Sequence, residues 1–204
     1  MSWQTKKVFF GKYAFNVWEN VYEPAEDSFL FAQNLLIQDN DIVLDMGTGC
    51  GILGIIAAEK ASKVTAIDIN PHAVRCAKEN ARLNKFSKKV FFLQGNLFAP
   101  LSTRAKFDVI LFNAPYLPSE SIELNNWLEC GWSGGINGRQ IIDRFICEAS
   151  TYLKRKGHIL LMQSTLSGVD ETLNKFKQKG LQTEIIAEQS LPFFETIVLI
   201  KAEN

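Results

Sequence analysis

The chain has 204 residues, of which 47% are hydrophobic and 22% are charged. This length and composition favour one globular domain with a full core and exclude a disordered chain. Lys and Arg together number 22, as do Asp and Glu, so the chain lacks the net positive charge of a protein that binds many phosphates. A local basic patch is still compatible with this balance.

The four cysteines are Cys50, Cys76, Cys130 and Cys147, and no pair has Cys-x-x-Cys spacing. We therefore expect reduced thiols and no metal site. The sequence has no apolar run long enough to cross a bilayer, and its first residues lack the apolar stretch of a signal peptide. These features predict a cytoplasmic protein that does not bind membranes.

In chain order, the first buried strand is predicted at residues 42–44, and a glycine-rich run separates it from a helix over 52–60. A second strand, 64–67, ends at Asp68. Asn70 then starts a helix that runs to Leu83, because Asn caps free amide groups and the following Pro fits the first turn.

Strands at 90–93 and 107–112 follow, and a loop rich in Gly, Ser and Pro then spans about residues 115–138. The remaining predicted elements are a helix over 140–153, Gly157 as the end of that helical region, a strand at 158–162, a helix over 169–179 and strands at 183–187 and 195–200.

Strands separated by helices imply a parallel sheet covered on both faces. The last two strands have no helix between them, which implies an antiparallel hairpin at the sheet edge. We thus predict an α/β fold with a seven-stranded, mostly parallel sheet and helices on both faces. The sequence shows no repeat or linker, so we expect a single domain over residues 21–204 after an N-terminal extension over residues 1–20.

The glycine-rich run points to a nucleoside cofactor. Gly47, Gly49 and Gly51 fall where a strand must turn into a helix, and the helix amino end adds free amide donors. The carboxylate of Asp68 can accept hydrogen bonds from both hydroxyls of a ribose. The run also fits the Gly-x-Gly-x-x-Gly dinucleotide fingerprint, so this motif alone leaves NAD and S-adenosylmethionine open. Asp45 favours S-adenosylmethionine, because an acid two residues before the first glycine resembles the loop of class I methyltransferases, in which it faces the cationic methionine end of the cofactor. A negative charge is less natural beside a pyrophosphate.

A second motif, Asn113-Ala114-Pro115-Tyr116, follows the strand at 107–112. The side-chain oxygen of Asn113 and the carbonyl of Ala114 can accept the two N–H bonds of an amide or exocyclic amino group and favour a pyramidal, nucleophilic nitrogen. Tyr116 can stack on a flat group, and Pro115 stiffens the turn. Positioning and electrostatics are then the main catalytic contributions. The motif predicts methyl transfer to such a nitrogen.

The turn resembles the Asn-Pro-Pro-Tyr motif of amino-group methyltransferases, with Ala in place of the first Pro. Two segments are more specific than the glycine loop, namely Tyr-Glu-Pro-Ala-Glu-Asp within residues 21–28 and Trp-x-Gly-Gly-x-Asn-Gly-Arg at 132–139, which is followed by Ile-Asp-Arg-Phe at 142–145. Together they resemble the short archaeal and eukaryotic branch of the HemK-type protein glutamine N5-methyltransferases. The resemblance covers about residues 20–200 and implies a Rossmann-like class I methyltransferase fold.

The resemblance also implies a substrate, a partner and a set of binding residues. The substrate is the glutamine of the Gly-Gly-Gln loop in a class I peptide chain release factor, and the partner is a small zinc-binding activator protein that covers an apolar sheet edge. Asn113 is expected to bind cofactor and substrate. The cofactor-lining residues expected from the family are Ser28, Asp45, Gly47, Asp68, Asn96 and Leu97, with Asn96 in a position where the family often has Asp.

Several alternatives stay open. An RNA or DNA amino group fits the same pair of acceptors, and Lys6, Lys7, Lys12, Lys85, Lys88 and Lys89 would serve RNA if they cluster. A NAD-dependent dehydrogenase and a non-catalytic binding protein are the other classes. In the acidic cluster Glu23, Glu26 and Asp27, Glu23 and Glu26 are expected to cap and solubilise the first helix. Trp132 is either core or a substrate contact. Phe91, Phe92 and Phe98 are expected in the core.

Overall fold

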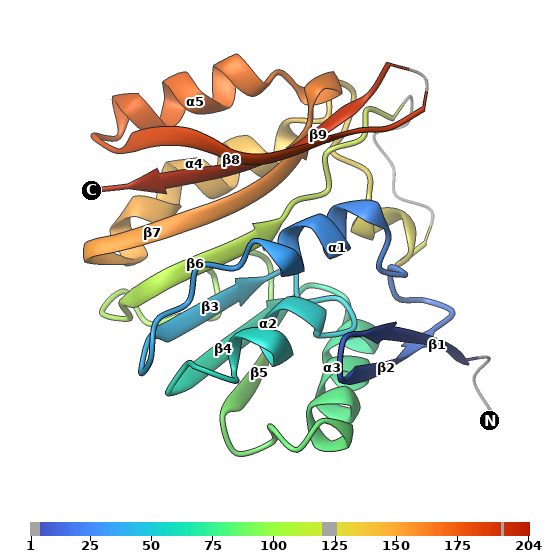
Figure 1. The fold of residues 1–204 in the computed structure, drawn as a ribbon. Coiled ribbons are helices and arrows are strands. Elements are labelled where there is room, and N and C mark those ends of the chain that lie inside the picture. The colour runs from blue at the N-terminus through green and yellow to red at the C-terminus, as the bar shows by residue number, and fades with distance from the viewer. Residues whose placement is uncertain (1–4, 120–125, 193) are drawn as a thin grey trace.

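The computed structural model describes residues 5–119, 126–192 and 194–204. Seven strands form a sheet in the order β5-β4-β3-β6-β7-β9-β8 (Figure 1). Their bounds are β3 Ile42–Met46, β4 Lys63–Asp68, β5 Val90–Gln94, β6 Phe107–Asn113, β7 Leu153–Ser164, β8 Gln182–Ser190 and β9 Thr196–Glu203. The pairs from β5 to β7 are parallel, and β9 runs antiparallel to β7 and β8. The predicted mostly parallel sheet with an antiparallel edge hairpin is confirmed.

Helices cover the two faces of this sheet. Their bounds are α1 Glu26–Gln33, α2 Ile52–Ala57, α3 Pro71–Leu83, α4 Gln140–Tyr152 and α5 Val169–Gln178. Figure 1 shows α1 and α2 in front of the sheet and α4 behind it, where α4 packs against α5. In the described part of the chain, no helix is both long and apolar enough to span a membrane.

Aromatic side chains between α4 and the sheet pack against β6, the strand that precedes the Asn-x-Pro-Tyr turn. Phe145 on α4 packs 4.6 Å from Phe112 on β6 and 5.4 Å from Phe98, measured between ring centroids. Phe98 is buried as predicted, but Phe91 is 50% exposed on β5. The prediction of a core position fails for Phe91 because β5 is an edge strand.

The N-terminal residues form a hairpin that the sequence analysis did not predict. Its strands are β1, Thr5–Phe10, and β2, Tyr13–Trp18, and they pair with each other rather than with the main sheet. Phe15 and Val17 on β2 are buried in the core, and β2 packs against α3. The segment is therefore integrated into the body of the protein.

Asn80 on α3 and Asn84, which caps the end of this helix, pair with the backbone of β2. The side chain of Asn80 accepts from the Asn16 N–H and donates to the Asn16 carbonyl, both at 2.8 Å. Asn84, one helical turn later, makes the same pair of bonds with Ala14 at 3.2 and 2.8 Å. Four residues along the helix thus cover about the same distance as two residues along the strand. The two amides therefore satisfy backbone N–H and carbonyl groups along one edge of the hairpin.

A further difference from the predicted elements lies in β7. The strand begins at Leu153, directly after α4, and not at His158. Gly157 therefore lies within the strand and does not end a helical region. A Cβ at this glycine would stand 2.7 Å from the Asp108 carbonyl of β6, so the close approach of two backbones requires glycine here.

The predicted loop at 115–138 is only partly described, because residues 120–125 fall outside the described residues. The rest of it includes a short 3-10 helix, Glu129–Gly131, and a bridge between Leu117 and Ser133. This segment returns to the end of β6 and covers the carboxyl ends of the central strands.

Candidate active site

A cavity of about 750 Å³ lies at the carboxyl ends of β3, β4 and β6. Its size is in the range of small-molecule sites, and its place is where parallel α/β sheets bind ligands. Most of the predicted site residues line it, namely Ser28, Gly47, Gly49, Asp68, Asn96, Leu97, Asn113, Ala114, Pro115 and Tyr116. Asp45 and Gly51 do not lie in its wall.

Gly49 and Gly51 have different roles in the loop. Gly49 has a φ of +56° and faces open space, so a ligand can approach its backbone. Gly51 has a φ of +91°, and a Cβ there would meet Ile55 at 3.0 Å and Ala77 at 3.1 Å. Gly51 therefore allows α2 and α3 to pack together, whereas Gly49 keeps the cavity open.

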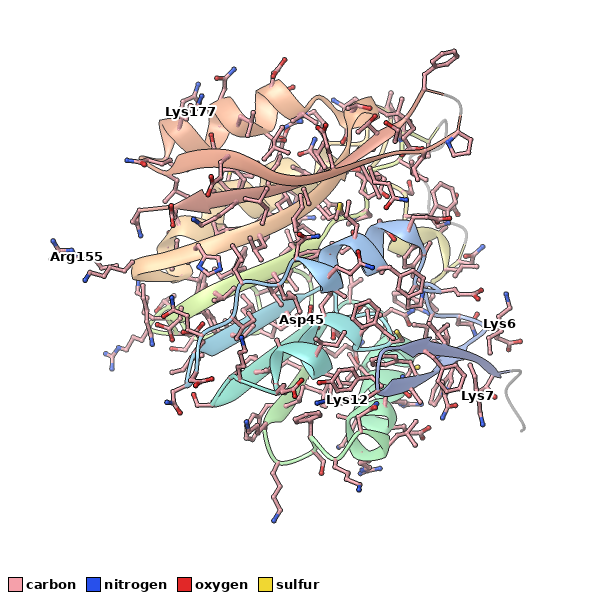
Figure 2. The ribbon with its side chains drawn as sticks, in the orientation of Figure 1. Lys6, Lys7, Lys12, Asp45, Arg155 and Lys177 are labelled. Carbon is pink, nitrogen blue, oxygen red and sulfur yellow. The ribbon has the colours of Figure 1, made fainter. Side chains whose placement is uncertain are left out.

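Asp45 lies beneath the glycine loop and is 1% exposed. Figure 2 shows it in the interior of the molecule. Its Oδ2 accepts hydrogen bonds from the Thr48 hydroxyl at 2.5 Å and from the Gly54 N–H at 3.0 Å. Burial raises the pKa of Asp45 to about 7. The carboxylate thus ties the loop to the start of α2, and it reaches the cavity only through the loop.

Asp68 holds the opposite side of the loop. Its Oδ2 accepts from the Gly49 N–H and its Oδ1 from the Asn70 N–H, both at 2.9 Å. Burial raises the pKa of this carboxyl. Asn70 also caps α3 through the His72 N–H, as predicted, and donates to the Asn20 carbonyl at 2.7 Å. The carboxylate is therefore fixed at the cavity wall.

Asn96 and Leu97 stand at the far end of the cavity, after β5. The side-chain oxygen of Asn96 accepts from Arg144 Nη2 at 3.2 Å. Arg144 on α4 also lines the cavity and was not among the predicted site residues. Leu97 has a φ of +48°, an unusual conformation for a residue with a side chain. It is buried in the cavity wall.

Asn113 occupies the last position of β6, and its side chain enters the cavity. Its Nδ2 donates to Asp27 Oδ2 at 3.1 Å and to Ser28 Oγ at 3.2 Å. Its Oδ1 is buried and has no hydrogen-bond partner among the described residues. A buried acceptor in this state costs free energy unless a ligand supplies a donor.

Asp27 lies in this site, although it was not among the predicted site residues. It is 5% exposed and lines the cavity beside Asn113. The Tyr22 hydroxyl donates to both of its oxygens at 3.1 Å, and the Tyr116 hydroxyl donates to Oδ2 at 3.3 Å. The segment around residue 27 carried the family resemblance, and that specificity was the signal that its acid has a role in the site.

The remaining turn residues complete this wall. The N–H of Ala114, which a Pro would lack, meets the Met162 carbonyl of β7 at 3.4 Å. Burial, together with the charge of Asp27, raises the pKa of Tyr116 and of Tyr22, so both hydroxyls stay protonated and act as donors. Hydrogen bonds to β7 and to α1 therefore hold the turn in place.

The segment 132–139 forms the roof of the cavity and its anchor. Trp132 is half-buried in the wall, so it belongs to the site rather than to the core. The Arg139 guanidinium is buried, pairs with Asp143 at 2.7 Å and donates to the Gly168 carbonyl at 2.6 Å. Arg139 thus joins α4 to the start of α5 and holds the roof in place.

A glycine loop between β3 and α2, an acid at the end of β4 and an Asn-x-Pro-Tyr turn after β6 define a class I methyltransferase. The family described as a methyltransferase domain matches residues 37–191. The chain belongs to the HemK-type protein glutamine N5-methyltransferases, in the short archaeal and eukaryotic branch.

Two relatives show this membership. A protein of Methanocaldococcus jannaschii with the provisional name protein N5-glutamine methyltransferase is 46% identical over 181 residues, which cover 88% of this chain and 90% of that one. Human methyltransferase HEMK2 is 32% identical over 185 residues, covering 85% and 86%. Among solved structures, Encephalitozoon cuniculi Mtq2, in its complex with Trm112, has a TM-score of 0.66 at 24% identity and covers 91% of this chain and 99% of that one. That complex is described as responsible for methylation of the eRF1 translation termination factor.

Proposed function

We propose that the protein methylates the side-chain amide of the glutamine in the Gly-Gly-Gln loop of a class I peptide chain release factor, with S-adenosylmethionine as methyl donor. The observation that carries this proposal is the buried Oδ1 of Asn113, an acceptor without a partner among the described residues, in a cavity wall. A glutamine amide supplies the donor that this oxygen lacks. The names of the relatives, which include release factor glutamine methyltransferases, support the same substrate.

The residues around the glycine loop fit the cofactor. The open space at Gly49 admits its methionine end, and the Asp68 carboxylate can accept from its ribose hydroxyls. Asn96 and Leu97 would hold the adenine, and Ser28 lines the cavity next to Asn113. Asp45 would act indirectly, because its carboxyl group holds the loop through Thr48 and Gly54. When bound, S-adenosylmethionine supplies an electrophilic methyl group on a sulfonium centre.

The protein's own contribution is to hold the amide. Asn113 Oδ1 and the Ala114 carbonyl would accept its two N–H bonds and favour the pyramidal nitrogen that attacks. Pro115 stiffens the turn, and the Tyr116 ring lies in the wall against which a flat amide can rest. These are positioning and electrostatic effects, which need no strong base before transfer.

The described lysines do not favour a nucleic-acid substrate. Lys6 pairs with Glu23 at 2.6 Å, and Lys12 pairs with Glu59. Lys89 donates to the carbonyls of Ala58 and Ala61, both at 2.9 Å. Figure 2 shows Lys6 and Lys7 on the hairpin side, with Arg155 and Lys177 at distant parts of the surface. The labelled cations thus form no single basic face.

We further propose that a small zinc-binding activator protein covers the edge strand β5. This edge is exposed and apolar, with Phe91 50% and Leu93 37% exposed, and Lys63 lies 5.0 Å from the Phe91 ring centroid. An unpaired strand edge of this kind is a template for strand addition or a liability for aggregation. The Mtq2–Trm112 complex provides the precedent for such a partner.

The test uses methyl-labelled S-adenosylmethionine with three acceptors, which are the class I release factor of the same organism, that factor with its loop glutamine changed to Ala, and total RNA. Label on the unchanged factor alone is the expected result. Label in RNA, or label on the Gln→Ala factor, would overturn the proposed substrate. The absence of label from every acceptor, with the activator protein present, would overturn the proposal as a whole.

The variant Asn113→Ala tests the role of the unpaired oxygen in the same assay. It should lower the rate of transfer by about 10²-fold or more, in the range seen when one catalytic hydrogen bond is removed. Its Kd for S-adenosylmethionine, measured by calorimetry, should stay close to that of the wild type. A full transfer rate in this variant would show that Asn113 does not hold the amide.

A further inference from the structure

Five hydrogen-bond donors meet at the buried carboxylate of Asp27. Oδ1 accepts from the Ser28 N–H at 2.6 Å and the Ser28 hydroxyl at 3.2 Å, and Oδ2 accepts from Asn113 and Tyr116 at 3.1 and 3.3 Å. The Tyr22 hydroxyl reaches both oxygens. No lysine or arginine among the described residues forms an ion pair with it. A negative charge held by neutral donors alone, in the wall of a catalytic cavity, requires an explanation beyond helix capping.

The arrangement has a direct effect on Asn113. The two ends of a carboxamide have nearly the same shape, so only the hydrogen-bond network decides which end points where. An ionised carboxylate can only accept, and therefore the NH2 end of Asn113 must face Asp27. One of its N–H groups goes to Asp27 and the other to Ser28 Oγ. Both donors are used, and Oδ1 is left pointing away from them.

We infer that Asp27 is the positioning residue that fixes the amide orientation of Asn113 and so keeps Oδ1 available for the substrate N–H. This inference rests on the proposed function. In the opposite orientation Asn113 would present its NH2 group to the NH2 group of the substrate amide, two donors facing each other. Such a contact excludes the productive complex, so the choice of orientation controls the reaction.

The variant Asp27→Asn is designed to reverse this orientation. Its new amide oxygen would keep the Ser28 N–H, the shortest of the bonds, and its NH2 group would then face Asn113. Asn113 would turn its oxygen toward that group and its own NH2 toward the substrate. We expect kcat to fall by about 10²-fold, with a nearly unchanged Kd for S-adenosylmethionine.

The double variant Asp27→Asn with Asn113→Asp exchanges the two groups. An acid at position 113 accepts from the amide at position 27 with one oxygen and offers the other to the substrate, and the number of carboxylates in the site is restored. The methyl-transfer rate of this double variant should be at least tenfold higher than that of Asp27→Asn alone. Glu26→Gln is the matched control, because Glu26 is the exposed acid beside Asp27 in the same helical turn, and it should keep the wild-type rate.

A measurement that does not depend on methyl transfer tests this inference separately from the proposed function. In NMR spectra of the free protein, the side-chain NH2 resonances of Asn113, assigned by their absence in Asn113→Ala, should exchange slowly with water and lose protection in Asp27→Asn. Unchanged protection, a wild-type rate in Asp27→Asn or a double variant no faster than the single one would each overturn the inference. A protein that methylates no release factor but shows the loss of protection would overturn the function and support the positioning role.

Discussion

The side chain of Asn80 donates to the carbonyl of Cys50 at 2.8 Å, which joins α3 to the glycine loop. The same NH2 group donates to the Asn16 carbonyl of β2, also at 2.8 Å. Asn80 is fully buried, so one amide connects the N-terminal hairpin, the helix and the loop that faces the cavity. The hairpin is thereby coupled to the proposed cofactor site.

Asn80→Ala should weaken both stability and cofactor binding. The change leaves the N–H and carbonyl of Asn16 and the carbonyl of Cys50 without this partner, which should cost about 2–4 kcal/mol of unfolding free energy. Urea unfolding measures that loss, and calorimetry with S-adenosylmethionine should show a raised Kd.

The matched control for that experiment is Asn84→Ala. Asn84 bonds the hairpin backbone at Ala14 and the carbonyl of Asn80, and its side chain forms no hydrogen bond with the described residues of the glycine loop. It should therefore lower stability while the Kd for S-adenosylmethionine stays near the wild-type value. Equal effects of the two variants on the Kd would contradict the coupling through Asn80.

Glycine substitutions should separate packing from binding in the loop. Gly51→Ala places a methyl group 3.0 Å from Ile55 and 3.1 Å from Ala77 at a φ of +91°, so we expect a loss of about 2–4 kcal/mol in unfolding free energy. Gly49→Ala meets nothing within 4 Å and should cost only about 1 kcal/mol of stability.

The Kd for S-adenosylmethionine should respond in the opposite order, because Gly49 lines the cavity and Gly51 does not. A methyl group at Gly49 would occupy space that the ligand needs, and we expect the Kd to rise by about tenfold or more. Cofactor binding that is unaffected by Gly49→Ala would place the ligand elsewhere in the cavity.

Asp45 should make stability depend on pH in a definite direction. Its folded-state pKa of about 7 lies above the value near 3.9 of an unfolded Asp, so between these values the folded state binds more protons. Stability should therefore fall by a few kcal/mol as the pH rises from about 4 through about 7. Asp45→Asn removes this titration but keeps an oxygen for Thr48 and Gly54.

The difference in unfolding free energy between pH 5 and pH 8, measured by urea titration, should be smaller in Asp45→Asn than in the wild type. Other groups titrate in both proteins and cancel in this comparison. An identical pH dependence in the two proteins would show that the Asp45 carboxyl is not held neutral by burial.

Ala114→Pro should restore the family's Asn-Pro-Pro-Tyr pattern without loss of activity. The substitution removes only the long 3.4 Å bond between the Ala114 N–H and the Met162 carbonyl, and the carbonyl proposed as an acceptor is kept. Stability should change by less than about 1 kcal/mol. A methyl-transfer assay that found the variant inactive would show that this N–H is needed to hold the turn.

Much of the fold could be predicted because its cause is local. The helix from Asn70 follows from a cap and a proline, and α3 ends at Leu83 as expected. The strands β3, β4 and β6 follow from buried, mainly apolar runs, and the lack of a helix between β8 and β9 correctly indicated an edge hairpin. The extension of β7 to Leu153 was not predictable, since it depends on pairing with Phe107 of a different strand.

The same distinction between local patterns and contacts of distant residues applies to the candidate site. The sequence by itself determined which chemical groups are present, namely a glycine loop after β3, an acid after β4 and an amide at the end of β6, because strand ends and turns are written in neighbouring residues. Only the tertiary structure decided how these groups face one another. Asp27 bonds Asn113 across 86 residues, and Asn80 bonds Cys50 across 30, through contacts that no local pattern encodes. Hydrogen bonds are directional and short in range, so the orientation of Asn113 and the burial of Asp45 follow only once the sheet has brought distant segments together.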